Sequence, residues 1–247
     1  MKNFEDIADK VKEALGLEYF PVGMVFSDNM PDGAINTGNH SRSCLVPLIL
    51  SSAKGKIVAF SNEKTGRSCA SFYLGYKNWI FEGIECFLSN EVVMEREPER
   101  FIKTKEQAKA FVESMAPEKL NDKVTVFKPL NRFRPGETPE LVIFFANADQ
   151  ISGLVLLLHF AMSEREDLVV TRFTSGCGSL VTYPMKLKAA NQQKAVWGMH
   201  DIAARVHFPA NLMSLSMPFE LFKEITKEMD DSFLITETWR KIKERNL

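Results

Sequence analysis

Apolar residues along this chain recur with two spacings, one typical of amphipathic helices and one typical of strands. From Phe4 to Leu15 they lie three or four residues apart, which predicts a helix over residues 3–16 with one buried face. The run Leu141–Phe145 is continuously apolar, as expected for a strand covered on both faces. By the same criteria, further helices are predicted at residues 43–54, 68–80, 104–117, 148–162 and 218–229, from Cys177 onward, and around 235–242. Strands are predicted at residues 21–26, 57–60, 124–127, 168–173, 195–197 and 212–217.

Three stretches do not resolve into one element. Residues 83–94 fit either a strand or a helix, and residues 200–206 fit either a loop or a short helix. Residues 27–43 are rich in Asn, Asp, Gly and Pro and form a long loop. A loop of that length is either a functional lid or a surface excursion, and the pattern leaves both open.

The alternation of strands and helices predicts an α+β or α/β fold, with a mixed sheet built from two pseudo-repeated strand-helix-strand-helix halves. Residues 130–139 contain two prolines and a glycine and resemble a linker between these halves. We therefore expect a single domain with an internal duplication, in which the halves cover residues 1–130 and 131–247.

Two stretches of the chain follow the same order of apolar and small residues. In residues 45–76, an apolar run and a strand lead to Cys69 with serine and alanine beside it; in residues 154–184, a similar run and strand lead to Cys177 between two glycines. This parallel predicts one repeated helix-strand-helix unit, with Cys69 and Cys177 in equivalent places.

Composition and charge narrow the class of partner. The 247 residues include 31 basic and 32 acidic ones, and a net charge of −1 does not attract nucleic acid or an acidic membrane. The longest apolar run, residues 151–162, is shorter than the roughly 20 residues that cross a bilayer, and the charged helix at 3–16 is unlike a signal peptide. We expect a cytoplasmic protein with a small-molecule ligand and with neither a nucleic-acid nor a membrane partner. Its oligomeric state is not indicated.

The four cysteines are too few for a disulfide framework, and their spacing matches no zinc or ferredoxin signature. Cys44, Cys69 and Cys177 all fall where a helix is predicted to begin. The dipole and the unpaired amides of a helix start lower the pKa of a thiol and favour the thiolate, which binds metals or attacks electrophiles. We expect these three thiols to lie close together, although each could also be a buried core thiol. Cys86 has no helix start nearby and is predicted to be core.

The residues around Cys177 also allow a site without sulfur chemistry. Gly176, Gly178 and Ser179 are small, so a bound group could approach the backbone at a helix start, where phosphate and carboxylate bind. Arg67 and Arg172 could add charge-assisted hydrogen bonds to such an anion.

His200 lies next to Asp201 on a loop that contains glycine. It is a candidate fourth metal ligand or proton carrier, and the alternative is an ordinary loop histidine. Signatures of hydrolases and of nucleotide-binding loops are missing from the sequence, so no reaction is assigned and it stays open whether the protein is an enzyme.

Several short motifs resemble the ArCR family, a domain of unknown function (169) that is widespread in archaea and anaerobic bacteria. The motifs that carry the resemblance are Ser43-Cys44-Leu45, Ser68–Ser71, Leu74–Tyr76, Gly176–Gly178 and Met217–Leu221. The resemblance covers most of the chain and implies no established activity.

Family members carry extra cysteines where this chain has Trp197–His200. A cysteine-rich protein of anaerobes is a candidate for thiolate-metal chemistry, which is an implication of the resemblance. The leading hypothesis is that Cys44, Cys69 and Cys177, with His200 as a fourth position, hold an iron-sulfur cluster or a thiolate-bound metal that has a redox role. The alternative is a non-redox protein that binds a small anionic ligand at the Gly/Ser turn.

Overall fold

The computed structural model describes residues 4–36, 44–62, 69–78, 80–93, 97–117, 123–162 and 167–245. Within these residues one mixed sheet of eight strands runs in the order β2-β3-β4-β1-β5-β8-β7-β6. The strands are β1 (Val22–Ser27), β2 (Ile35–Asn36), β3 (Val58–Phe60), β4 (Val124–Pro129), β5 (Leu141–Ala146), β6 (Val169–Val170), β7 (Ala195–Gly198) and β8 (Met213–Pro218). The combination of this mixed sheet with many helices confirms the α+β class.

Helices and helical turns connect these strands. The α-helices are α1 (Phe4–Leu15), α2 (Leu45–Ala53), α3 (Cys69–Tyr73), α4 (Ile84–Leu88), α5 (Lys105–Met115), α6 (Ala148–Ala161), α7 (Tyr183–Ala189), α8 (Ile202–Arg205), α9 (Phe219–Lys227) and α10 (Glu237–Glu244). The other turns are the 3-10 turns η2 (Leu130–Arg132), η4 (Met229–Asp231) and η5 (Phe233–Ile235) and the π-helical turn η3 (Gly178–Thr182). No helix in the described part of the chain is long and apolar enough to span a membrane.

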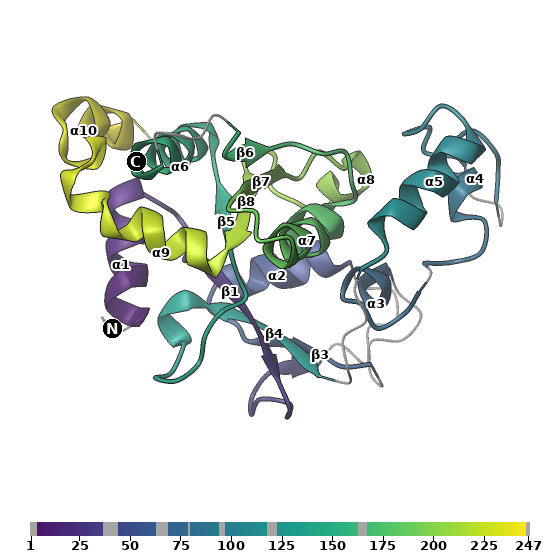
Figure 1. Cartoon of the computed structure of the whole chain (residues 1–247), viewed down its shortest axis with the longest axis horizontal. Coiled ribbons are helices and arrows are strands. Elements are labelled where there is room, and N and C mark those ends of the chain that lie inside the picture. Colours follow the sequence, from purple (N-terminus) through teal and green to yellow (C-terminus); the bar gives the residue numbers. More distant parts are fainter. Residues whose placement is uncertain are drawn as a thin grey trace.

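Two apolar cores lie on opposite faces of the sheet. Along β5, Ile143 and Phe145 belong to the core beneath α2 and η3, whereas Val142 and Phe144 belong to the core beneath α1, α6 and α9 (Figure 1). Successive strand side chains point to opposite faces, so a strand with a core on each side must be apolar throughout. This arrangement confirms the prediction from Leu141–Phe145.

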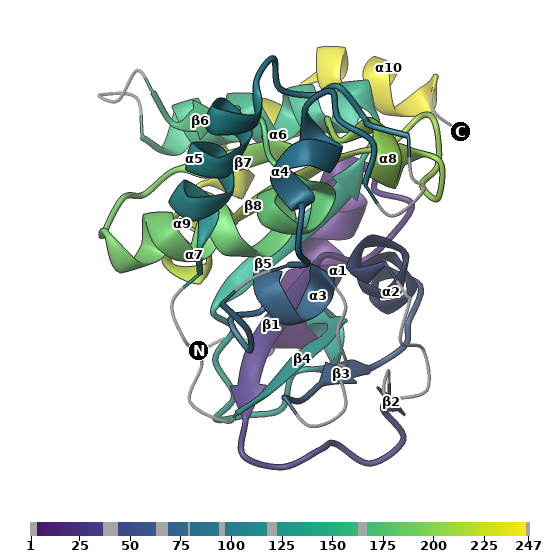
Figure 2. The same cartoon turned by 90° about the vertical axis from the view of Figure 1, so that its right-hand side faces the viewer.

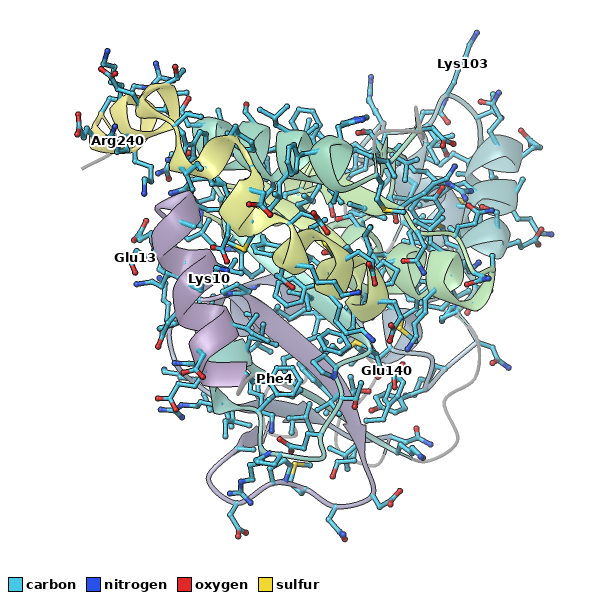
Figure 3. The ribbon with its side chains drawn as sticks, turned by 60° about the vertical axis from the view of Figure 1, so that its left-hand side comes forward. Phe4, Lys10, Glu13, Lys103, Glu140 and Arg240 are labelled. Carbon is cyan, nitrogen blue, oxygen red and sulfur yellow. The ribbon has the colours of Figure 1, made fainter. Side chains whose placement is uncertain are left out.

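The helix starts follow the local sequence. Asn147 and Gln150 form a reciprocal capping box at α6, and Thr104 accepts a hydrogen bond from the backbone of Gln107 at α5. At α1, Phe4 packs toward the sheet against other rings of the same core (Figure 3). The predicted amphipathic helix at the N-terminus is therefore confirmed.

The strand order is the same in both halves when it is followed outward from the central β1-β5 pair. One half runs β1-β4-β3-β2 and the other runs β5-β8-β7-β6. In each half the outer pair is parallel, and the remaining neighbours, including β1 and β5, are antiparallel. In this order α2 follows β2, and the helix that opens at Gly176 follows β6. Cys44 and Cys177 therefore occupy corresponding positions.

The predicted match between residues 45–76 and 154–184 is not supported. Both apolar runs are helices, but α2 packs into the core on one face of the sheet and α6 into the core on the other. The strands that follow also differ in place, because β3 lies between two strands and β6 lies at the edge. The match relied on an apolar run followed by small residues, a pattern that any buried helix can show. It therefore paired Cys69 with Cys177, although Cys44 is the residue in the corresponding position.

Several predicted boundaries change. The helix predicted at 68–80 is only α3 in the described residues, and the chain turns at Gly75, whose φ is 78°. The strand predicted at 168–173 is reduced to β6. Residues 83–94 begin as α4, and the short helix α8 settles the choice at 200–206.

A helical arm carries the chain away from the sheet between β3 and β4. This arm, residues 80–93 and 97–115, contains α4 and α5 and lies beyond α3 (Figures 1 and 2). Part of the predicted loop at 27–43 also has structure, because it contains β2; its residues 37–43 lie outside the described part of the chain. The arm is the element that completes the cavity described next.

Candidate functional site

Three cysteines that are far apart in sequence meet on one face of the sheet. Cys44 immediately precedes α2, Cys69 is the first residue of α3, and Cys177 lies in the first turn of the helix that opens at Gly176. All three cysteines line one cavity, and the thiol of Cys177 lies close enough to those of Cys44 and Cys69 to shift their pKa values. We call these three residues the thiol cluster. The structure thus brings together the three cysteines that the sequence predicted to converge.

The central thiol and the two outer thiols shift their pKa values in opposite directions. The hydrogen bond with Cys177 lowers the pKa of Cys44 to about 7, with help from the backbone at Val46 and against burial and the charge of Asp201. The same hydrogen bond lowers the pKa of Cys69, against burial. The bonds to both neighbours, together with burial, raise the pKa of Cys177 well above its ordinary value. Cys177 therefore keeps its proton and stabilises a thiolate on Cys44 or Cys69.

The turn before Cys177 is fixed by a buried carboxylate. Asp201 Oδ2 accepts a hydrogen bond from the N–H of Gly176 at 2.9 Å, while Oδ1 accepts bonds from the N–H groups of Ala203 (3.0 Å) and Ala204 (3.4 Å) at the start of α8. One side chain thus caps α8 and holds the turn that carries Cys177.

Close packing explains the glycine at position 176. A Cβ atom there would lie 2.8 Å from Val46 Cγ2 and 3.0 Å from Ala204 Cβ. Because Val46 belongs to α2 and Ala204 to α8, only glycine lets both helices approach the turn. This approach brings Cys44, at the start of α2, next to Cys177.

The chain after Cys177 continues as the π-helical turn η3 and then as α7. π-helical turns within helices are uncommon and occur frequently at functional sites. Here the turn keeps Gly178–Thr182 buried between the sheet and α3, and Thr182 Oγ1 donates a hydrogen bond to the carbonyl of Tyr73 at 2.9 Å. The helix that begins with Cys177 is thereby tied to the helix that begins with Cys69.

The thiol cluster lies on a cavity of about 290 Å³. The three cysteines and Ser175 line it, and the chain around α8 contributes Asp201, Ala203 and His207. Ile84, Phe87 and Phe111 of the arm line this cavity together with the thiol cluster. The cluster therefore has an approach for a ligand, although Cys177 itself is only 3% exposed.

The residues predicted to bind an anion already have other partners. The N–H of Gly178 donates to Ser175 Oγ at 3.0 Å, the N–H of Ser179 donates to the carbonyl of Ser175, and Gly176 donates to Asp201. Arg172 donates to Ser114 Oγ at 2.8 Å and stacks over Tyr183, away from the cavity lining. Arg67 lies outside the described residues.

His200 is not in the cavity lining. It is exposed, and its ring packs against Trp197 with the centroids 5.8 Å apart. The preceding Met199 has a φ of 69° and a fully buried side chain, so the chain reverses there and directs the next residue outward. The imidazole in the lining is His207, which the sequence did not single out.

A family model for the uncharacterised ArCR family (domain of unknown function 169) matches residues 10–228. The chain belongs to the ArCR family. The match runs from α1 to the end of α9 and includes all four cysteines. Searches of curated proteins and of solved structures each gave no match. The resemblance to the ArCR family over most of the chain is therefore confirmed. Because the family is uncharacterised, its membership does not identify a reaction.

The arrangement of ligating groups in this ArCR chain is not that of a preformed metal site. Among the described residues, no group of three or more His, Cys, Asp or Glu side chains stands ready to hold a metal ion. The thiols of the cluster instead interact with one another. Any metal would have to displace their protons.

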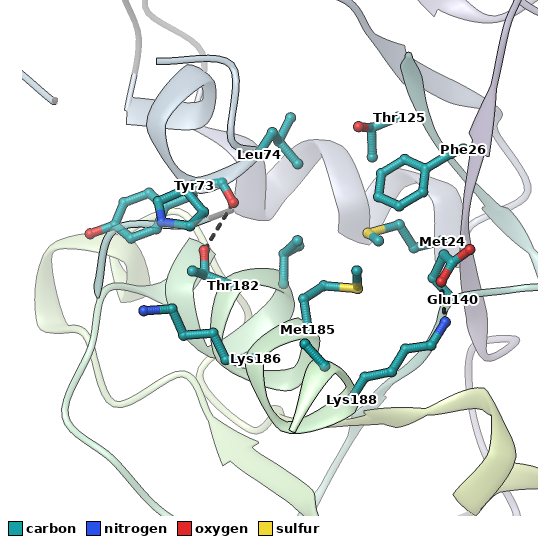
Figure 4. Close-up of a pocket in the computed structure, with 13 residues that line it drawn as sticks. Met24, Phe26, Tyr73, Leu74, Thr125, Glu140, Thr182, Met185, Lys186 and Lys188 are labelled. Atoms are coloured by element: carbon teal, nitrogen blue, oxygen red, sulfur yellow. Dashed lines mark hydrogen bonds and ion pairs between the residues drawn. The ribbon is translucent and has the colours of Figure 1, made fainter. Parts of the chain in front are cut away.

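A second cavity, of about 280 Å³, lies on the other side of Tyr73, which lines both cavities. Figure 4 shows Met24 and Met185 on facing sides of it, and an ion pair between Lys188 and Glu140 at one end. No cysteine lines this second cavity in the described structure. Three of the four cysteines of this ArCR chain thus line the first cavity.

Proposed function

We propose that Cys44, Cys69 and Cys177 form a thiolate site that holds an iron-sulfur cluster or another thiolate-bound metal with a redox role. The observation that carries the proposal is that Cys44, Cys69 and Cys177 line one cavity, with Cys177 interacting with both other thiols. Three sulfur donors from three separate helix starts are a donor set suited to iron-sulfur clusters and to soft metal ions.

The protonation of the thiol cluster supports ligand binding by sulfur. A cysteine ligates a metal as the thiolate, so metal binding must release the thiol protons. Cys44, with a pKa of about 7, is already partly deprotonated at neutral pH, and the pKa of Cys69 is lowered too. The pKa of Cys177 is raised, so a bound cation would have to displace its proton.

The remaining coordination position would face the cavity. Asp201 lies at the cavity but uses both carboxylate oxygens to accept backbone hydrogen bonds, and His207 lies at its margin. Three protein ligands with a fourth position left to a ligand or substrate is the arrangement of reactive metal centres, in contrast to closed structural sites.

The alternative, a small anion at Gly176–Ser179, has less support. The N–H groups of Gly176, Gly178 and Ser179 are occupied by partners within the turn. One of these partners is the carboxylate of Asp201, and a negative group at this place repels an anion. The thiolate site is therefore the function that the geometry supports better.

The test is metal analysis of anaerobically purified protein. Wild type should contain iron with acid-labile sulfide, or another soft metal, and should show the corresponding visible absorption. Cys44→Ser, Cys69→Ser and Cys177→Ser should each lose most of the metal, while the matched control Cys86→Ser retains it. Wild-type protein without metal after anaerobic reconstitution, or equal loss in the Cys86→Ser variant, contradicts the proposal.

A further inference from the structure

The cavity beside the thiol cluster has an apolar outer wall. The arm supplies Ile84, Phe87, Phe101 and Phe111 to it, and Phe81 packs edge-on against Phe87 with the ring centroids 5.9 Å apart. Aromatic walls of this kind favour apolar ligands, which gain by leaving water and by packing against the rings. At about 290 Å³ the cavity is at the small end of ligand pockets.

The charges around the cavity disfavour an anionic ligand. Among the described residues that line it there is no lysine or arginine, and His207 at the margin is the sole basic side chain. The carboxylate of Asp201, which also lines the cavity, places negative charge there. A carboxylate or phosphate would lose its hydration there without gaining a lysine or arginine counter-charge, which disfavours its binding.

We infer that this cavity binds a small, uncharged, largely apolar molecule directly against the thiols of Cys44 and Cys69. The inference rests on the proposed function in one respect only. If these thiols hold a metal, its free coordination position would face the bound molecule. Binding itself depends only on the apolar wall and on the lack of a lysine or arginine. Both are features of the described residues that line the cavity.

Protection of the metal-free protein against alkylation tests the inference. Benzyl alcohol and benzoate share one ring and differ in charge, so they serve as the neutral probe and its anionic match. Benzyl alcohol should slow iodoacetamide modification of Cys44 by about threefold or more, benzoate should not, and Cys86 should react unchanged in both. Peptide mass mapping gives each rate separately. Protection of Cys44 by benzoate equal to that by benzyl alcohol, or no protection by benzyl alcohol, overturns the inference.

Two neighbouring exposed residues of α8 give a matched pair of variants. Ala203 lines the cavity, whereas Ile202 does not line it and is 67% exposed. Ala203→Trp should fill the cavity and remove the protection by benzyl alcohol, and Ile202→Trp should keep it. Because both side chains are at the surface, both variants should fold, which circular dichroism checks. Protection that persists in Ala203→Trp counts against this cavity.

The two experiments separate the proposals. Protection of Cys44 by benzyl alcohol in a protein that never acquires metal leaves the ligand site standing and removes the metal centre. A protein with iron and sulfide but without such protection retains the metal centre and refutes the ligand class.

Discussion

The thiol of Cys44 and the thiol of Cys86 each interact with another titratable group, yet their pKa values move in opposite directions. Cys44 interacts with a neutral donor, the thiol of Cys177, and its pKa falls to about 7. Cys86 Sγ donates to Glu91 Oε2 at 3.0 Å, and this carboxylate raises the pKa of Cys86 despite the nearby Lys105. A neighbour that donates a proton favours the thiolate, and one that accepts a proton keeps the thiol. The chemistry of the neighbour decides which cysteine is reactive.

The largest expected effect is the difference in reactivity between these two thiols. At pH 7 a thiol with a pKa of about 7 is half ionised, whereas an ordinary cysteine with a pKa of about 8.5 is ionised to only a few per cent and Cys86 to less. Cys44 should therefore react with iodoacetamide at least about tenfold faster than Cys86 in metal-free protein. Peptide mass mapping over time measures both rates, and equal rates would remove the distinction.

Removal of the central thiol should make Cys44 more like an ordinary cysteine. In Cys177→Ala the largest cause of its lowered pKa is gone, so the pKa should rise toward about 8.5 and the alkylation rate at pH 7 should drop by up to roughly fifteenfold. Cys177→Ser retains a hydroxyl donor and should restore part of the effect. The pH profile of Cys44 alkylation measures the shift, with Cys86→Ala as the control that should leave it unchanged. An unchanged profile in Cys177→Ala contradicts the account.

A smaller effect is expected from Asp201→Asn. An asparagine amide has one acceptor oxygen where the carboxylate has two, so it cannot accept from the N–H groups of Gly176, Ala203 and Ala204 together. The variant should therefore lose about 1–3 kcal/mol in the free energy of unfolding. The charge of Asp201 raises the pKa of Cys44, so its removal should lower that pKa slightly. Urea unfolding and the alkylation profile measure the two effects. Asp28→Asn, at an exposed position, should change neither.

The smallest effect concerns Cys86 itself. Glu91→Gln removes the carboxylate that raises the pKa of Cys86, so alkylation of Cys86 should become modestly faster. The rates at Cys44 and Cys69 should stay the same, because among the described residues Glu91 bonds to Cys86 and Lys105 and not to the thiol cluster. A coupled change in the thiol cluster would show that the two thiol environments are connected.

The sequence predicted the sheet, most helices and the convergence of three thiols, because apolar spacing and helix starts are local properties. It did not predict which cysteine of the first half corresponds to Cys177. That cysteine is Cys44, and the correspondence follows from the strand order across the sheet. Nor did it separate His200 from His207. That choice depends on the chain reversal at Met199, which a local pattern does not reveal.

The role of Asp201 was only partly visible in the sequence. Its position before Ile202-Ala-Ala is typical of a helix N-cap, and in the structure its side chain caps α8. Its second oxygen, however, binds Gly176, which is distant along the chain. Long-range contacts of this kind arise only when the fold is assembled.

Disulfide trapping measures the central claim, that Cys44 and Cys69 flank Cys177 in one site, most directly. Mild oxidation of metal-free protein with diamide, followed by peptide mapping, should give bridges from Cys177 to Cys44 or to Cys69 while Cys86 remains a free thiol. Cys177→Ser should sharply reduce the amount of intramolecular bridge. If oxidation leaves all three thiols unbridged, or joins them mainly to Cys86 or between molecules, the thiol cluster does not exist as described.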